Sequence, residues 1–314
     1  MFITNKELMD MALKEGFALG AFNVNNMELI QGITAAAVEL NAPLILQVSK
    51  GARDYAGRDY IMKLVEAAEK ETGLPIAVHL DHGPDFELCK SVIDDGFTSV
   101  MIDGSHEPFE QNMTLTKKVV DYAHPKGVSV EGELGKLVGE QFDSGEGGKI
   151  AANAVYTDPD EAKMFVEKTG CDALAVAIGT SHGAYKFKAE PKLDFDRLKL
   201  IREKVNIPLV LHGASSVLPE YVDICNKYGA AIEGSKGVPE DQIKKAVAIG
   251  VQKVNIDTDL RLALTAGIRK QMMKDPKNFD PRKYLAPARD LVKEVVARKI
   301  KLLGCDGKAD LFKK

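Results

Sequence analysis

The sequence predicts an α/β protein built as a closed (β/α)8 TIM barrel, because eight short apolar runs alternate with longer helical patterns along most of its 314 residues. An open doubly wound sheet is disfavoured, since no GxGxxG motif follows the first run and the alternation has no break at its midpoint. The predicted strands are FALGAFNV (17–24), PLILQVS (43–49), PIAVHLD (75–81), TSVMID (98–103), VSVEGEL (128–134), DALAVAI (172–178), PLVLHG (208–213) and VQKVNID (251–257).

Helical segments are predicted between these runs. Several open with Asp, Asn or Pro, residues that cap or begin helices well. The segments are 27–40, 58–72, 84–95, 107–124, 158–168, 194–205 and 219–228.

Two stretches fall outside the alternation and give the barrel its additions. Residues 134–157 are rich in Gly and acidic side chains and predict a mobile active-site loop. Residues 274–314 form a charged helical extension that begins near Pro281 and packs outside the barrel or on a partner. Without these stretches about 250 residues remain, which is typical of one barrel, so 1–314 is predicted to be a single barrel domain.

Composition supports this fold and excludes several classes of function. Hydrophobic residues make up 45% and aromatic residues only 6%, without Trp, so the core must consist mainly of Val, Ile, Leu and Ala, which suits buried parallel strands. The net charge of −4 and the lack of a Lys/Arg block argue against nucleic acid as a partner. No apolar run approaches the ~18 residues of a membrane span. Together with the scattered Cys89, Cys171, Cys225 and Cys305, this predicts a cytoplasmic protein.

Polar side chains gather where the predicted strands end, which is the face of a barrel that carries its chemistry. Solvated loop residues would be scattered over both ends of the barrel. The cluster therefore predicts one site, formed from Asn23, Ser49, Lys50, Asp81, His82, Asp103, Glu131, Glu133, Thr180, Ser181, His182, His212, Asn255, Asp257, Thr258 and Asp259.

Three of the six histidines lie just beyond three different predicted strands: His82, His182 and His212. One histidine in such a place is more often a hydrogen-bonded structural residue. Three neutral imidazoles that converge and leave a fourth position open form a catalytic zinc site, so the set favours zinc. The remaining histidines, His79, His106 and His124, are interpreted as structural.

Carboxylates accompany the histidines. Asp81 and His82 can serve one site only if the strand ends there, because neighbours in a regular strand point to opposite faces, and the following Gly83 and Pro84 favour such an end. Asp81 suits either an acid/base acting on a hydroxyl or a hydrogen-bond partner of a ligating imidazole. Asp103 and Glu133 suit a second cation or support for the first.

A second group of residues suits phosphate, because Gly allows backbone N–H groups to approach an anion and hydroxyls complete the contacts. It comprises Gly183, Lys186, Gly213, Ser215, Ser216, Asp257 and Thr258. Arg261 and Arg282 are able to hold a second phosphate through paired N–H groups.

Several motifs resemble those of the class II, metal-dependent fructose-1,6-bisphosphate aldolases, and their residues are closest to the type B branch. They are AFNVNN, HLDHG, EGELG, IGTSHGAYK, LHGASS, GSKGV and KVNIDTDLRLA. The resemblance continues through FDPRKYLAPAR and covers nearly the whole chain. It implies a lyase of glycolysis and gluconeogenesis that reversibly cleaves D-fructose 1,6-bisphosphate, a sugar bisphosphate, to dihydroxyacetone phosphate and D-glyceraldehyde 3-phosphate. It also implies a homodimer or homotetramer.

The resemblance assigns roles residue by residue. It implies Zn²⁺ on His82, His182 and His212, a second divalent metal or displaced zinc on Asp103 and Glu133, and Asp81 as the acid/base for the C4 hydroxyl. The dihydroxyacetone phosphate end, with a nearby Na⁺ or K⁺, would be bound by Gly183, Lys186, Gly213, Ser215, Asn255, Asp257 and Thr258. The other phosphate end would be bound by Asn23, Ser49, Arg261 and Arg282, the last from a neighbouring subunit, and Asp280 would contact substrate hydroxyls.

One segment departs from the family pattern. Relatives carry a Glu-Asp pair after GELG whose glutamate is a candidate base for the C3 proton, but this loop has GEQFDSGEGG, with Gln141 at about that place. Glu140 is therefore the predicted base, with Glu146 as the alternative.

Three other functions stay open at this point. Tagatose 1,6-bisphosphate is an alternative substrate, although DTDLRLA and Asp280 favour fructose. A Schiff-base aldolase would have to use Lys253, which is the sole lysine within the predicted strands. A barrel that binds phosphate without turnover is the alternative outside enzymes.

Overall fold

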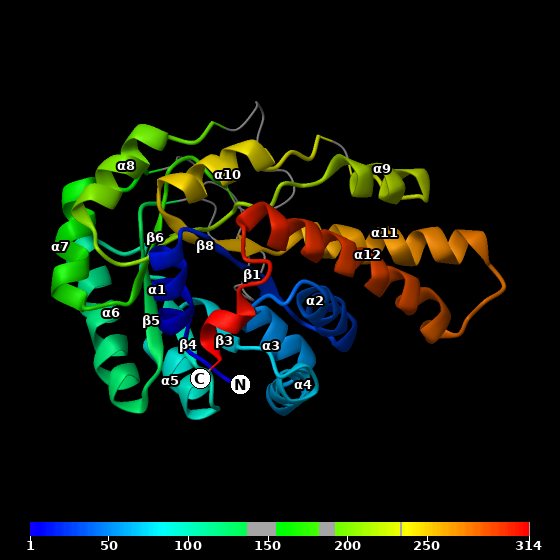
Figure 1. Ribbon diagram of the computed structural model, residues 1–314, viewed down its shortest axis with the longest axis horizontal. Helices are drawn as coiled ribbons and strands as arrows, with labels where there is room; N and C mark the ends of the chain where they lie inside the picture. The colour runs from blue at the N-terminus through cyan, green and yellow to red at the C-terminus, as the bar shows by residue number, and fades with distance from the viewer. Residues whose placement is uncertain (137–154, 182–191, 233, 314) are drawn as a thin grey trace.

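Eight parallel strands close into a barrel in the computed structural model, which describes residues 1–136, 155–181, 192–232 and 234–313 (Figure 1). Each strand pairs with its neighbours in chain order, and β1 pairs with β8 to complete the circle. The predicted (β/α)8 fold is confirmed. The strands are β1 (Leu19–Asn23), β2 (Leu44–Ser49), β3 (Ile76–Gly83), β4 (Ser99–Ile102), β5 (Ser129–Leu134), β6 (Ala173–Val176), β7 (Leu209–Leu211) and β8 (Val251–Ile256).

Helices cover the outside of the barrel. They are α1 (Asn5–Glu15), α2 (Met27–Glu39), α3 (Lys50–Ala56), α4 (Arg58–Thr72), α5 (Phe86–Asp94), α6 (Phe109–Ala123), α7 (Pro159–Thr169), α8 (Phe195–Lys204), α9 (Pro219–Lys227), α10 (Glu240–Ile249), α11 (Thr258–Lys274) and α12 (Pro281–Leu303), with the short 3-10 turns η1 (His124–Lys126) and η2 (Ala309–Phe312). Helices α1, α3, α10 and α11 are not among the helical segments predicted from the sequence.

Aspartate caps explain why several helices begin where the sequence predicts. The side chain of Asp85 accepts from the backbone N–H of Leu88, at the start of α5. Asp158 and Asp194 cap α7 and α8 in the same way. Each cap satisfies a backbone donor that the first turn of a helix leaves unpaired.

The strands are buried on both faces, as parallel strands between a packed interior and covering helices should be. Every residue in the eight strands is buried except His82, which is intermediate. Most strand residues are Val, Ile, Leu or Ala, which agrees with the scarcity of aromatic residues. The polar residues inside the barrel are therefore exceptions that need partners.

Helices α11 and α12 lie side by side and extend away from the barrel (Figure 1). Small residues allow this close contact, since a Cβ added to Gly267 of α11 would lie 2.4 Å from Ala288 Cα of α12. Helix α12 also packs on α2, where a Cβ added to Gly32 would lie 2.8 Å from Val292 Cγ1. The C-terminal extension thus packs on the outer helices of its own chain.

Most of the predicted loop 134–157 lies outside the described residues, so its motion stays a prediction. Its two ends are held together, because Lys136 and Val155 exchange backbone hydrogen bonds of 2.7 and 3.0 Å. Among the described residues, no helix is long and apolar enough to cross a membrane.

Candidate active site and metal centre

An irregularity in β3 turns His82 and Asp81 toward one site. The prediction that this strand ends at Asp81 is wrong, because β3 continues to Gly83 with a shift of register after Leu80. His82 has a φ of +50°, which is uncommon for a residue other than glycine. A Cβ at Gly83 would lie 2.6 Å from the carbonyl oxygen of Met101, so this turn requires glycine. The bulge replaces the strand end as the reason that both side chains reach the site.

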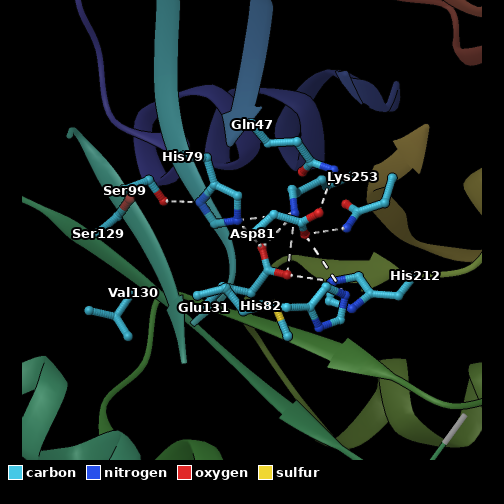
Figure 2. A network of polar contacts seen from close by, with 12 residues as sticks. Gln47, His79, Asp81, His82, Ser99, Ser129, Val130, Glu131, His212 and Lys253 are labelled. Carbon is cyan, nitrogen blue, oxygen red and sulfur yellow. Dashed lines mark hydrogen bonds and ion pairs between the residues drawn. The ribbon is translucent and has the colours of Figure 1, made fainter. Parts of the chain in front are cut away.

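His82, Glu133 and His212 converge at the ends of β3, β5 and β7. Each offers one possible ligand atom, and these atoms lie within 4.8 Å of one another. Glu133 Oε2 is 3.8 Å from His82 Nδ1 and 3.6 Å from His212 Nδ1. The two imidazole rings meet edge to face with their centroids 4.6 Å apart (Figure 2). His182, the predicted third ligand, lies outside the described residues.

The residues present fit a metal ion. Glu133 Oε2 is buried and has no hydrogen-bond partner within the described part of the chain, although it faces both imidazoles. A buried carboxylate oxygen without such a partner is costly, and a cation would satisfy it. Imidazole nitrogen and carboxylate oxygen are both ligands that zinc accepts.

Other carboxylates also contact the two imidazoles, Asp103 at the nitrogen of His82 that faces Glu133 and Glu131 at the nitrogen of His212 that does not. Asp103 Oδ2 is 2.9 Å from His82 Nδ1, and its other oxygen accepts from the backbone and side chain of Ser105. Glu131 Oε1 is 2.8 Å from His212 Nε2. Such partners fix the orientation of metal-binding histidines in other proteins.

The charges around the histidines favour a cation. Burial alone would lower the pKa of His82, but the carboxylates of Asp81, Asp103 and Glu133 raise it to about 10. The pKa of His212 is also raised, because Glu133 and Glu131 outweigh its burial. The site therefore has an excess of negative charge that a metal ion would neutralise.

Asp81 lies beside this cluster and is held by amides. Its Oδ2 accepts from Asn23 at 2.8 Å and from Gln47 at 3.3 Å, and its Oδ1 accepts from Asn255 at 3.0 Å. Burial would raise the pKa of Asp81, but His82, Lys253 and His212 lower it below its usual value. The carboxylate is thus ionised and fixed in direction. Its Oδ1 is 3.9 Å from His82 Nε2, which is too long for a hydrogen bond.

A buried polar chain that the sequence analysis did not assemble runs across the barrel interior (Figure 2). Lys253 Nζ is 3.0 Å from Glu131 Oε2 and 3.3 Å from His79 Nε2, and His79 Nδ1 is 2.9 Å from Ser99 Oγ. Burial and Lys253 lower the pKa of His79 to about 3. Lys253 is thus paired with a carboxylate, which disfavours it as the neutral nucleophile of a Schiff-base aldolase.

The alternation of residues in a strand could have revealed this chain. Residues two apart in a strand point to the same face. Asp81 and Glu133 were both predicted to face the site, so His79 and Glu131, two residues before them, must also face the interior. Lys253 is related to Asn255 in the same way. An inward positive charge and an inward negative charge on different strands predict an ion pair.

The proposed phosphate residues that the structure describes also come together. Gly213 has a φ of +58°, and a Cβ there would lie 2.4 Å from the carbonyl oxygen of Ser181. Ser215 Oγ accepts from the backbone N–H of Asp257 at 3.3 Å, and Thr258 is the first residue of α11. The loop after β7 thus meets the end of β8. Gly183 and Lys186 lie outside the described residues.

Other predicted substrate residues have different surroundings. Asn23 contacts Asp81, and Ser49 accepts from the N–H of Ala52 as the N-cap of α3. Arg261 Nε donates to Asp257 Oδ1 at 2.7 Å.

Asp280 and Arg282 pair with each other at the start of α12, far out on the helical extension, where the Arg282 side chain is 87% exposed (Figure 1). Within one chain, these two residues are not brought to the site. Glu140, the predicted base, lies outside the described residues, as do Gln141 and Glu146.

Comparison with known proteins decides the family to which the chain belongs. The family model described as class-II fructose-bisphosphate aldolase matches residues 3–308. The chain belongs to the class II fructose-bisphosphate aldolases. The resemblance seen in the motifs is confirmed, and with it the class of enzyme, a lyase of a metal-dependent family.

Curated relatives and solved structures agree with this family. The fructose-bisphosphate aldolase of Giardia intestinalis is 50% identical over 313 residues, which covers 99% of this chain and 95% of the relative. That of Thermus caldophilus is 50% identical over 309 residues, 98% of this chain and all of the relative. The crystal structure of the YdjI aldolase from Escherichia coli K12 matches with a TM-score of 0.80 and 33% identity, over 98% of this chain and all of that one. Neither tagatose bisphosphate nor a barrel without turnover is favoured by these relatives.

Proposed function

We propose that this aldolase cleaves D-fructose 1,6-bisphosphate between C3 and C4, with Zn²⁺ bound by His82, His212 and His182. The observation that carries the proposal is an ionised carboxylate, Asp81, beside a cluster of two imidazoles and a carboxylate. Zinc in this place would supply a Lewis acid for the ketone oxygen of the substrate. The products are dihydroxyacetone phosphate and D-glyceraldehyde 3-phosphate.

Asp81 is the acid/base in this proposal. During cleavage it takes the proton of the C4 hydroxyl as the C3–C4 bond breaks, and during condensation it returns that proton. Two features support this role over that of a partner for His82. Asp81 does not hydrogen-bond to His82, and Asp103 already contacts Nδ1 of that imidazole. The amides of Asn23, Gln47 and Asn255 aim the carboxylate.

The C3 proton and any second metal involve other carboxylates. Glu140 is the proposed base that exchanges the C3 proton, brought to the site by loop 134–157. Glu133 and Asp103 are proposed to hold a second divalent cation or a displaced zinc. Glu133 is the better placed of the two, because its Oε2 lacks a hydrogen-bond partner within the described residues, whereas Asp103 binds Ser105 and His82.

The two phosphates are proposed to bind at opposite ends of the substrate. The dihydroxyacetone phosphate end would be bound by Gly183, Lys186, Gly213, Ser215, Asn255, Asp257 and Thr258, with a Na⁺ or K⁺ beside the phosphate. The other phosphate would be bound by Asn23, Ser49, Arg261 and Arg282, and Asp280 would contact substrate hydroxyls.

We place the active enzyme in the cytoplasm as a homodimer or homotetramer. The position of Arg282 supports an oligomer, because this residue is far from the site of its own chain and would have to serve a neighbour. Mixing Arg282→Ala chains with Asp81→Asn chains then restores activity, since some sites receive both native residues. Activity no greater than the sum of the separate variants would contradict a shared site.

Metal removal and return test the main proposal. The enzyme is dialysed against a chelator, then supplied with Zn²⁺, and cleavage of fructose and tagatose bisphosphates is followed side by side. We expect activity to vanish and to return at about one zinc per chain, with fructose bisphosphate the better substrate. The control is His124→Ala, which removes a histidine paired with Asp172 away from the cluster. Chelator-resistant cleavage would overturn the zinc assignment.

A further inference from the structure

A largely buried ion cluster contacts the loop 213–218, which includes Ser215. It joins the start of α11, the C-terminal part of α12 and the start of α10. Its members are Asp259 and Lys299, which contact the loop at Ser216, Val217 and Leu218, and Glu240, which pairs with Lys299.

Asp259 binds the backbone of the loop. Its Oδ1 accepts from the N–H groups of Val217 at 2.7 Å and Leu218 at 3.4 Å, and its Oδ2 accepts from that of Ser216 at 2.9 Å. Val217 has a φ of +51°, an unfavourable value for a β-branched residue. Three consecutive donors on one carboxylate stabilise this strained turn.

Lys299 completes the cluster from the C-terminal extension. Its ammonium donates to Ser216 Oγ at 2.7 Å and Glu240 Oε1 at 3.0 Å, and it lies 3.1 Å from Asp259 Oδ2. The Lys299 side chain is 2% exposed and that of Asp259 is fully buried. Removing one partner of such a buried pair leaves the other charge uncompensated, which is strongly unfavourable.

Residues 237–238 also pack closely against the loop. A Cβ at Gly237 would lie 2.3 Å from the carbonyl oxygen of Ser215, and Val238 N–H donates to that oxygen at 3.2 Å. Ser215 and Ser216 diverge: Ser215 Oγ meets the backbone of Asp257 at the end of β8, whereas Ser216 Oγ meets Lys299. The cluster thus fixes the backbone that presents Ser215.

We propose that Asp259 and Lys299 are positioning residues for phosphate, which hold loop 213–218 in the conformation that binds the phosphate of dihydroxyacetone phosphate. This inference rests on the proposed function, in which Gly213 and Ser215 contact that phosphate. Neither residue is among the proposed substrate contacts, and neither belongs to the cluster of His82, Glu133 and His212. The C-terminal extension therefore contributes to substrate binding through its packing as well as through Arg282.

The test compares Lys299→Met with the matched variant Arg298→Met. Lys299→Met leaves Asp259 without its ammonium, so the KM for fructose 1,6-bisphosphate and the Ki of inorganic phosphate should each rise about tenfold or more, with kcat changed by less than about twofold. Zinc content per chain should stay at the wild-type value. Arg298 binds Glu240 and Glu220 and, among the described residues, has no hydrogen bond or ion pair to the loop, so its variant should keep both constants.

A milder variant keeps the inference testable if Lys299→Met fails to fold. Ser216→Ala removes the bond from Lys299 to the loop without exposing a buried charge, and the same two constants should rise by a smaller factor. Unchanged constants in both variants, with lower stability alone, would overturn the proposal. A fall in kcat together with an equal fall in zinc content in these variants would also overturn the proposal.

Ser215→Ala separates this failure from failure of the proposed function. If that variant binds inorganic phosphate as tightly as the wild type does, the assignment of the loop to phosphate is wrong, whatever the Lys299 variants show. If Ser215→Ala weakens phosphate binding while Lys299→Met and Ser216→Ala do not, only the positioning role is wrong.

Discussion

His212 Nε2 and Glu131 Oε1 lie 2.8 Å apart inside the barrel, where both side chains are 1% exposed. Burial would raise the pKa of Glu131, but Lys253, His79 and His212 lower it well below its usual value. An ionised carboxylate can only accept, so Nε2 carries the proton and donates. In the neutral ring, Nδ1 then has the lone pair, on the side that faces Glu133.

This relationship predicts that Glu131→Gln weakens metal binding. Glutamine keeps the size of the side chain but removes the charge that selects this tautomer of His212. Loss of such a partner typically reduces metal affinity by about 10–100-fold. Zinc affinity is measured by competition with a chelator of known strength.

Asp172→Asn is the matched control for this measurement. Asp172 Oδ2 is 2.9 Å from His124 Nε2, the same kind of pair, but His124 is not part of the metal cluster. This variant should lose some stability and keep its zinc affinity. Equal zinc affinity in Glu131→Gln and the wild type would show that Glu131 does not orient a ligand.

Asp81→Asn is expected to abolish most of the turnover while zinc stays bound. The amide cannot take the proton of the C4 hydroxyl, and a positioned acid/base contributes about 10²–10⁴-fold to rate. Steady-state cleavage rates and zinc per chain are measured on one preparation. A variant that loses zinc in proportion to activity would instead make Asp81 a support for the metal site.

The sequence predicted the barrel well for a physical reason. Strands buried on both faces must be apolar along their length, so runs such as PLILQVS stand out from the helical patterns around them. The strand ends then locate polar residues on one face. That is why Asp81, Glu133 and His212 could be grouped before any contact was known.

Backbone conformation and pairing were harder to predict. The turn at His82 depends on a positive φ and a shift of register. Neither feature can be predicted from the residue types there, apart from Gly83. Lys253 and Glu131 are 122 positions apart, and their ion pair follows from closure of the barrel. The burial of Lys299 was equally hard to predict, since a lysine in a charged helix usually faces solvent.

Gly267→Ala is expected to destabilise the packing of α11 on α12. The added Cβ would lie 2.4 Å from Ala288 Cα, so the two helices must separate. Overpacking of this kind costs about 1–3 kcal/mol, and the better helix propensity of Ala returns up to about 1 kcal/mol. Unfolding in urea measures the net loss.

Thr265→Ala serves as the control on the same helix, because Thr265 is exposed and its variant creates no clash. That variant should be as stable as the wild type or slightly more stable. A Gly267→Ala variant that is more stable than the wild type would contradict the close contact between α11 and α12.

Glu240→Gln is expected to make stability less sensitive to acid. Burial would raise the pKa of Glu240, but Arg298 and Lys299 lower it below the ordinary value of 4.5. A carboxyl with a lowered pKa in the folded state contributes stability above its unfolded pKa and loses it as the pH falls through the folded pKa. The wild type should therefore lose more unfolding free energy than Glu240→Gln between about pH 5 and the acid limit of folding. Arg298→Met removes one cause of the lowered pKa, so its loss of unfolding free energy should lie between those of the other two proteins. The measurement is urea unfolding at successive pH values. Parallel dependences of the unfolding free energy on pH in all three proteins would contradict the ion cluster.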